Sequence, residues 1–194
     1  MKILGIDPGS LNCGYGLIVA KHPRQTSSVT VRSHRPEQPA YGASGRIVMS
    51  ASKPLHERLQ DLFSSLQEVI AEYSPDVVVV ERVFFAKSTK SALTLGHARG
   101  VILLSAALCG KALHEYSALE VKKAVVGYGR AEKSQVEAMV RRILGIRHVL
   151  SPDSADALAL ALCHAQHQSF AEASGRINPL LAAKIPKPKA KSRK

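Results

Sequence analysis

Four acidic residues stand where predicted secondary-structure elements begin or end, and carboxylates in such places are able to bind divalent metal ions. Asp7 ends a short apolar run that starts at Ile3, and Glu81 ends a run of four valines. Asp153 and Asp156 open an Ala/Leu-rich segment that has the pattern of a helix. An all-oxygen ligand set suits Mg²⁺ or Mn²⁺ and does not suit Zn²⁺. The residue types therefore predict a site for hard divalent ions, provided that the fold brings the acids together.

Each acid also has an ordinary structural explanation. An Asp before a Pro-Gly pair, such as Asp7, is often a turn-former, and Glu81 beside Arg82 can be a surface ion pair. Asp153 and Asp156 are three residues apart, so they share one helix face and can stabilise the positive end of the helix dipole. Packed together, however, four acids repel one another strongly, which implies bound cations, raised pKa values, or both. The choice depends on the topology.

The apolar patterns predict the elements that would carry these acids. We expect strands at 2–7, 15–20, 28–33, 76–81 and 112–116, of which 28–33 is an edge strand. We expect helices at 53–73, 88–109, 119–126, 132–144 and 151–170. Residues 34–54 contain Pro, Gly and Ser without a sustained period, and we expect a loop or an embellished extension there. Ser151 and Pro152 are suited to the cap and the first position of the last helix.

This order of elements predicts an α/β fold with a five-stranded mixed sheet flanked by helices on both faces. Strands 2–7 and 76–81 would be parallel neighbours at its centre, so Asp7 and Glu81 would share one edge, where such folds commonly build sites. Two metal ions about 3.5–4 Å apart at that edge would be able to cleave a phosphodiester in line: one activates water and the other stabilises the leaving 3′ oxygen.

The charge of the chain favours a polyanionic partner. The formal net charge is +12, and two segments carry most of it: 184–194 has six Lys/Arg and no acid, and 21–54 has six Lys/Arg and one acid. Such segments attract nucleic acid through counterion release, although the Pro/Lys tail would also serve solubility alone. We expect one domain over 1–172, with a basic loop or insertion at 21–54, and a flexible tail at 173–194.

The remaining patterns bear on location and assembly. Cys13, Cys109 and Cys163 are odd in number and far apart, which predicts reduced thiols. We see no apolar run of about 18 residues and no secretory leader, so we expect a cytoplasmic protein without a membrane span. The helix expected at 88–109 is apolar around most of its girth and needs cover on more than one side. That cover is either the rest of this chain or a second subunit.

Four segments resemble the motifs of RuvC-type crossover junction endodeoxyribonucleases, in the right order. They are 5–16 (GIDPGSLNCGYG), 81–87 (ERVFFAK), 125–136 (VVGYGRAEKSQV) and 153–159 (DSADALA). The resemblance covers most of 1–20 and 74–165. It implies an RNase H-like fold, a homodimer, and paired, symmetric, metal-dependent incision of four-way (Holliday) DNA junctions during recombination and repair. It further implies two Mg²⁺ ions per active site, which Mn²⁺ can replace, and a branch-migration helicase as a partner.

The resemblance also implies roles for single residues. The catalytic, metal-binding acids of the family fall on Asp7, Glu81, Asp153 and Asp156, and the aromatic that contacts junction bases falls on Phe84. The lysines near the scissile phosphate fall on Lys122 and Lys133, and we expect Lys87 and Arg130, inside the same motifs, to contact DNA. Physically, Phe84 offers a face to an unstacked base and the lysines neutralise phosphate; a core phenylalanine and solvated lysines are the alternatives.

Two rival functions share some of these features. The Asp-Pro-Gly-Ser and Gly-Tyr-Gly segments resemble the phosphate loop of actin-like ATPases, which need two such domains around a nucleotide. A catalytically idle DNA-binding module would explain the charge, but it would not need four acids. ATP turnover without DNA, or metal-independent junction binding without cleavage, would favour these rivals.

Overall fold

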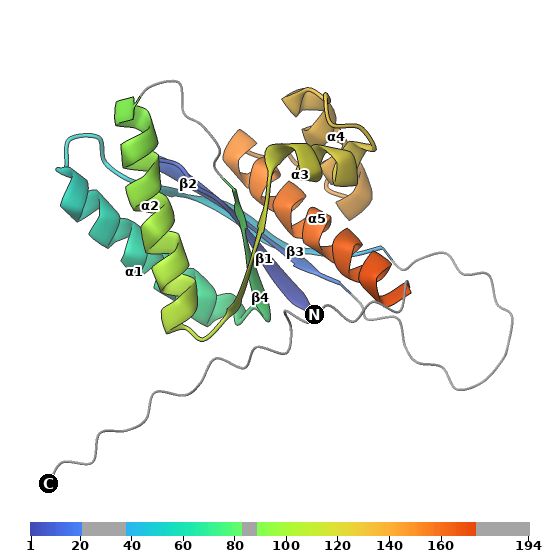
Figure 1. Ribbon diagram of the computed structural model, residues 1–194, viewed down its shortest axis with the longest axis horizontal. Coiled ribbons are helices and arrows are strands. Elements are labelled where there is room, and N and C mark those ends of the chain that lie inside the picture. Colours follow the sequence, from blue (N-terminus) through green and yellow to red (C-terminus); the bar gives the residue numbers. More distant parts are fainter. Residues whose placement is uncertain (21–37, 83–88, 174–194) are drawn as a thin grey trace, which may run out of the picture.

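The core of the computed structural model is one sheet with the strand order β3-β2-β1-β4-β5 (Figure 1). The structure describes residues 1–20, 38–82 and 89–173. The strands are β1 (Lys2–Asp7), β2 (Asn12–Val19), β3 (Ala40–Val48), β4 (Val77–Glu81) and β5 (Ala112–Tyr116). The helices are α1 (Leu55–Tyr73), α2 (Thr89–Leu108), α3 (Ala118–Val126), α4 (Lys133–Leu144) and α5 (Pro152–Ala173). The predicted fold class, with β1 and β4 parallel at its centre, is confirmed.

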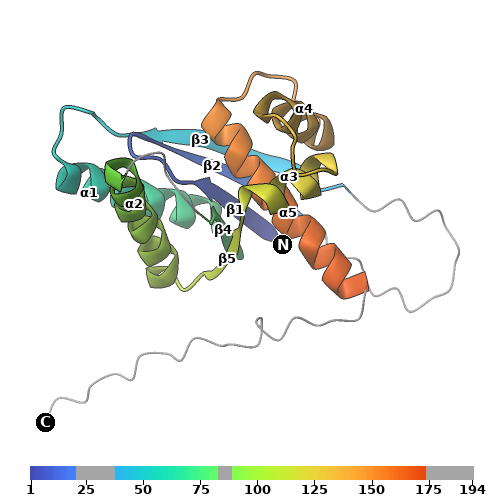
Figure 2. The ribbon, with the colours of Figure 1, turned by 45° about the horizontal axis from the view of Figure 1, so that its top comes forward.

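Alternation along the central strands explains why helices cover both faces. In β1, Ile3 packs toward α3, α4 and α5, whereas Leu4 and Ile6 pack toward α1 and α2. The valines of β4 divide between the same two layers, as expected for a strand buried on both sides. Figures 1 and 2 show α1 and α2 on one face and α3, α4 and α5 on the other. Because side chains alternate along a strand, Asp7 lies on the same face as Ile3, and Glu81 lies on the same face as Val77 and Val79. This is the face that α5 covers.

The prediction for residues 34–54 was wrong, because residues 40–48 form the edge strand β3. This strand pairs antiparallel with β2, from Ala40 opposite Val19 to Val48 opposite Asn12. It is rich in Gly, Ala and Ser and has one buried aliphatic side chain, that of Ile47, so its hydrophobic signal is weak. β3 forms because its backbone hydrogen-bonds to the backbone of β2, and the side chains of β3 do not predict this pairing. The strand predicted at 28–33 lies outside the described residues.

A second correction concerns the expectation that the chain has no apolar run of about 18 residues, because helix α2 contains one. Its window Ser91–Leu108 has a mean hydropathy of 1.3, so by length and composition it passes the test for a membrane span. The same helix is docked, however, through Ala98, Ile102 and Ala106, which are buried in the core layer that α1 shares. Core helices of this kind pass the same test. Only 22% of the window is buried, so the described residues leave much of the surface of α2 uncovered.

A cluster of aromatic side chains lies between β5 and α5. The ring of His164 is 1% exposed, and its Nδ1 lies 2.9 Å from the hydroxyl of Tyr116. The ring of His114 stands 4.4 Å from it, centroid to centroid. Burial, with smaller contributions from His114 and His167, lowers the pKa of His164 to about 4. The folded protein therefore holds this imidazole in its neutral form.

We expect mild acid to destabilise the protein through His164. In the unfolded chain a histidine has a pKa of about 6.5, so between pH 6.5 and 4 the unfolded state binds a proton that the folded state does not. The free energy of unfolding should fall as the pH drops through that window, by about 2 kcal/mol at pH 5 from this group. Urea unfolding at pH 7 and pH 5 measures it.

The variant His164→Gln should show a smaller loss between the two pH values, and the exposed His56→Gln should behave as wild type. Equal losses in wild type and His164→Gln would contradict the assignment.

Candidate active site

Strand register brings the first two acids together. Ile6 pairs with Val80 in the parallel ladder between β1 and β4, so Asp7 and Glu81 follow at the same edge. Asp7 ends β1 and Glu81 ends β4. Both side chains are half-buried. The predicted convergence of these two strand ends is confirmed.

Helix α5 brings the other two acids to this edge because it lies directly on the backbone of β1 and β2. A Cβ added at Gly5 would collide with the carbonyl oxygen of Ala157, and one added at Gly14 would collide with the backbone of Asp153. Since Gly14 is the partner of Asp7 across the sheet, this contact sets the first turn of α5 beside Asp7. Glycine at these strand positions is what allows the close approach.

The start of α5 is fixed as its sequence predicts. The Ser151 hydroxyl accepts a hydrogen bond from the backbone N–H of Ser154 at 3.2 Å, and Pro152 is the first helical residue. The hydroxyl of Ser154 donates to the carbonyl of Gly45 in β3 at 3.0 Å. Cap and anchor together hold the turn that carries Asp153 and Asp156.

Three of the four acids line a small hollow together with two lysines. Its volume is about 120 Å³. It is lined by Asp7, Glu81, Ala118, Val121, Lys122, Lys133, Val136, Asp156 and Leu160. Lys122 comes from α3 and Lys133 is the first residue of α4, so the two helices between β5 and α5 present one cation each. Asp153 lies beside this set and not in its lining.

The electrostatics of the hollow favour an added positive charge. Burial and, after it, the negative charges of Asp156, Glu81 and Asp153 raise the pKa of Asp7 to about 7, although the positive charge of Lys133 opposes them. Burial and Asp156 also raise the pKa of Glu81. Burial and the neighbouring negative charges thus make Asp7 and Glu81 costly to ionise, and a bound cation would offset that cost.

The two acids of α5, Asp153 and Asp156, each lie close to a basic side chain. The Nζ of Lys133 donates to Asp156 at 2.6 Å, and Nη1 of Arg46 lies 3.8 Å from Asp153. The sequence analysis did not single out Arg46, because its place opposite Asp153 depends on the register of β3. Both pairs are partly exposed, so each contributes little to stability.

The site suits a divalent ion in its chemistry more than in its present spacing. In the described part of the chain, no three acidic, histidine or cysteine side chains stand close enough to hold one ion as they are. One of the four acids, Asp156, instead forms an ion pair with Lys133. Carboxylate oxygens in this number fit Mg²⁺ or Mn²⁺, with Asp7, Glu81, Asp153 and Asp156 as the residues that would hold them.

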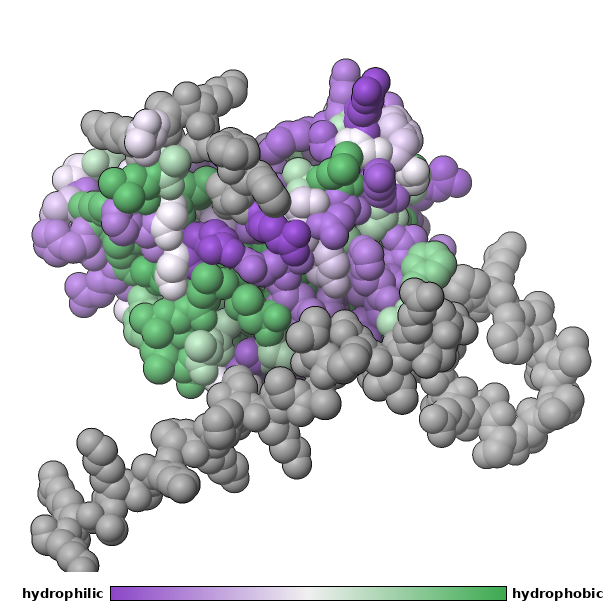
Figure 3. Space-filling model, in the orientation of Figure 1, coloured by the Kyte–Doolittle hydropathy of each residue, from purple (hydrophilic) through white to green (hydrophobic). Residues whose placement is uncertain are grey.

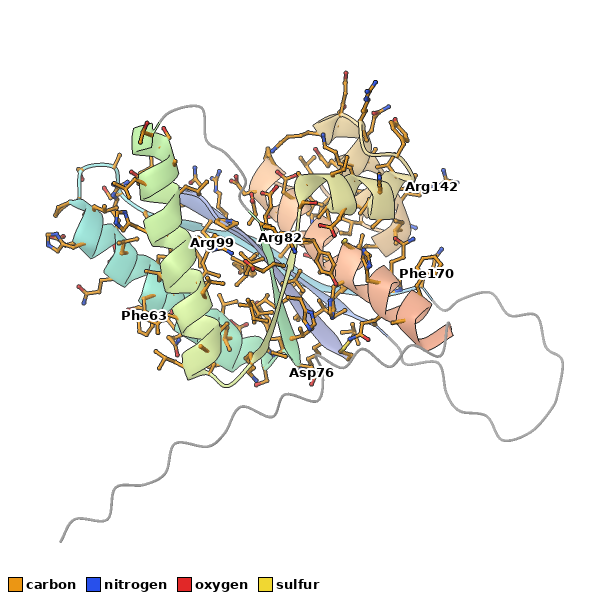
Figure 4. The ribbon with its side chains drawn as sticks, in the orientation of Figure 1. Phe63, Asp76, Arg82, Arg99, Arg142 and Phe170 are labelled. Atoms are coloured by element: carbon orange, nitrogen blue, oxygen red, sulfur yellow. The ribbon has the colours of Figure 1, made fainter. Side chains whose placement is uncertain are left out.

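Three of the five residues predicted to contact DNA lie in the described part of the chain. Lys122 and Lys133 line the hollow, and Arg130 is exposed on the connection between α3 and α4. Phe84 and Lys87 lie outside the described residues. Figure 4 shows Arg82 and Arg99 near this end of the sheet, and Arg99 forms an ion pair with Glu115.

The burial of Asp7 and its repulsion by the neighbouring acids predict that Asp7→Asn stabilises the metal-free protein. The raised pKa of Asp7 makes its ionised form unfavourable in the folded state, so the penalty grows from about pH 4 and is complete above pH 7. At pH 8 the variant should be more stable than wild type by at most about 4 kcal/mol, and at pH 4 by almost nothing. Thermal unfolding in EDTA at the two pH values measures this.

Adding Mg²⁺ at pH 8 should raise the Tm of wild type and raise that of Asp7→Asn much less, because only binding to the folded state stabilises it. A Tm for Asp7→Asn in EDTA no higher than that of wild type would show that burial and repulsion do not make the Asp7 carboxylate unfavourable as described.

Known proteins with this sequence pattern identify the family. The chain matches the crossover junction endodeoxyribonuclease RuvC family over residues 3–164. RuvC of Citrifermentans bemidjiense is 46% identical over 165 residues, which are 85% of this chain and 92% of that protein. RuvC of Heliobacterium modesticaldum is 48% identical over 164 residues, or 84% and 93% of the two chains.

Solved structures agree with the fold. Thermus thermophilus RuvC in complex with Holliday junction substrate matches with a TM-score of 0.76 at 31% identity, over 88% of this chain and 96% of that chain. The yeast mitochondrial Holliday junction resolvase, at 14% identity, shares the fold with a TM-score of 0.61 over 88% and 80% of the two chains. The predicted RNase H-like architecture is confirmed, and this chain belongs to the RuvC family of crossover junction endodeoxyribonucleases.

Proposed function

We propose that this protein is a structure-selective endonuclease that resolves four-way DNA junctions by paired phosphodiester hydrolysis, during recombination and repair. The observation that carries the proposal is the hollow in which Asp7, Glu81 and Asp156 face two lysines at one edge of the sheet. Family membership and a neighbour solved with Holliday junction substrate support the choice of substrate.

In this proposal the acidic residues bind the metal ions and the lysines of the hollow bind the phosphate. Asp7 and Glu81, with Asp156 and Asp153, would hold two Mg²⁺ ions, which Mn²⁺ can replace; bound ions lower the pKa of water and neutralise charge on the leaving 3′ oxygen. Lys122 and Lys133 are placed to hold the phosphate oxygens of the strand that is cut. Lys133 would leave Asp156 for phosphate when the carboxylate acquires a cation.

We further propose that two copies join through α2, which would give two related sites for two related strands. One stripe of α2 is open: Leu93, Leu104 and Leu108 are 64%, 53% and 64% exposed. Gly96 and Gly100 lie on the same stripe, and among the described residues a Cβ added at either would meet no atom within 4 Å. Figure 3 shows hydrophobic residues gathered along this helix. A second α2 would cover the stripe, with the glycines allowing close approach.

The proposal places the enzyme with its substrate in the cytoplasm, and it includes a branch-migration helicase as a further partner. Selection of the junction would come from its shape and from the distance between two basic clefts, more than from contacts to bases.

Asp7→Asn should lower the rate of junction cleavage at least about 100-fold, because the change removes a negative charge from the reacting centre. Junction binding should persist, because the change adds no charge that repels DNA. The measurement is Mg²⁺-dependent cutting of a synthetic four-way junction, with a matched linear duplex alongside and binding followed separately. The matched control is Asp76→Asn, since Asp76 lies at the opposite end of the sheet (Figure 4) and should leave cutting unchanged.

Substantial residual cleavage by Asp7→Asn would count against its role, and ATP turnover without DNA would favour the actin-like alternative.

Leu104→Asp should weaken the dimer by roughly 100-fold or more in Kd, because the symmetric contact would bury two unpaired carboxylates. Leu119→Asp is the matched control, since Leu119 on α3 is 52% exposed and lies outside the stripe. Sedimentation equilibrium reports the mass, and thermal unfolding checks that both variants fold. A Leu104→Asp protein that dimerises as wild type does would place the interface elsewhere.

A further inference from the structure

A second hollow, away from the acids, is lined by arginine. It lies at the C-terminal end of α4, has a volume of about 400 Å³, and is lined by Ala138, Arg141, Arg142, Gly145, Ile146 and Arg147. No acidic residue contributes to the lining. Figure 4 shows Arg142 on the flank of the molecule that faces away from α2. We call these six residues the arginine pocket.

The chain turn after α4 shapes this pocket. Gly145 adopts a left-handed conformation with a φ of 66°, and the N–H of Ile146 then donates to the carbonyl of Arg141 at 2.9 Å. This is the usual glycine-terminated helix end. Ile146 is buried, and Nη2 of Arg141 donates to the carbonyl of Arg147 at 3.2 Å. The turn is thus fastened to the helix, and it sets Arg147 beside Arg141 and Arg142 of α4 around one opening.

These arginines carry charge that the described residues do not neutralise. None of the ion pairs formed within 1–20, 38–82 and 89–173 includes Arg141, Arg142 or Arg147. The Nε of Arg141 is buried and has no hydrogen-bond partner there. Arginine near a helix C-terminus also interacts favourably with the helix dipole. That dipole amounts to about half a negative charge, so most of the charge of three arginines remains for a ligand.

We propose that the arginine pocket binds the phosphodiester backbone of a junction arm, several base pairs away from the cleaved bond. The inference rests on the proposed function. Guanidinium groups match phosphate oxygens in a forked geometry, and duplex DNA presents such oxygens along its whole length.

Helix α4 connects the pocket to the active site and sets the distance between them. Lys133, its first residue, lines the acidic hollow, and Arg141 and Arg142 follow eight and nine residues later. At 1.5 Å per residue these positions lie about 12–14 Å further along the helix. This equals roughly four base pairs at 3.4 Å each. A duplex arm leaving the site along α4 would therefore reach the arginine pocket within half a helical turn.

Neutralising single phosphates tests the contact directly. Junctions carrying one uncharged methylphosphonate at each successive position of the arms are bound to wild type and to Arg142→Ala/Arg147→Ala. Both of these side chains are exposed, so their removal leaves the core intact, and the half-buried Arg141 is kept. For wild type, we expect weaker binding when a phosphate about three to six nucleotides from the cleaved bond is neutral. For the double variant, the same substitution should make no further difference.

Salt dependence supplies a second readout. The slope of log K against log salt concentration should be smaller by about two for the double variant. The matched control is Lys111→Ala, which removes one charge just before β5, at the opposite end of the sheet. It should lose none of the sensitivity to methylphosphonates.

An identical methylphosphonate profile for wild type and double variant would overturn the proposal. Cleavage of the unmodified junction by wild type reports separately on the proposed function. If wild type cleaves and the two profiles coincide, only the arginine pocket is wrongly assigned; if wild type neither binds nor cleaves the junction, both proposals fail.

Discussion

The contact between α5 and the backbone of β1 and β2 is the constraint on which this site depends. No side chain separates the helix from the sheet at Gly5 and Gly14, so the first turn of α5 reaches the strand end that carries Asp7. A single methyl group at either glycine would push the helix outward. Asp153 and Asp156 would then move away from the other acids, although no acid had been changed. Packing of this kind, and not attraction between the functional groups, is what assembles the site.

That packing works against electrostatics, because it forces like charges together. Burial and this repulsion together raise the pKa values of Asp7 and Glu81, and the positive charge of Lys133, which contacts Asp156, offsets part of the cost. A site strained in this way gains affinity for any cation that enters it. The lysine that relieves the repulsion in the free protein is also the one best placed to meet phosphate. One side chain can thus serve both states, since its two partners are both anionic.

Much of this arrangement can be predicted from the sequence, and the exceptions have physical causes. The valines of β4 and the helical spacing of leucines in α1 report directly on burial, so these elements were predicted nearly to the residue. β3 was missed because its Gly, Ala and Ser positions carry little hydrophobic signal, and its pairing with β2 is a long-range property. Arg46 was missed for the same reason: nothing local says that it faces Asp153. The four acids can be singled out from the sequence because their motifs are local and ordered along the chain.

The dimer through α2 and the arginine pocket at the end of α4 are compatible with one arrangement of protein and DNA. Figure 1 shows these helices on opposite sides of the domain, with the active-site edge of the sheet between them. In a dimer joined through α2, each active site would lie some distance from the two-fold axis and each arginine pocket further out. Four-way junctions have the same order, since the exchange point is central and duplex arms lead outward. Positive charge at the outer flank would therefore meet an arm after the strand has passed the acids, which is where a backbone contact can orient the arm without hindering the cut.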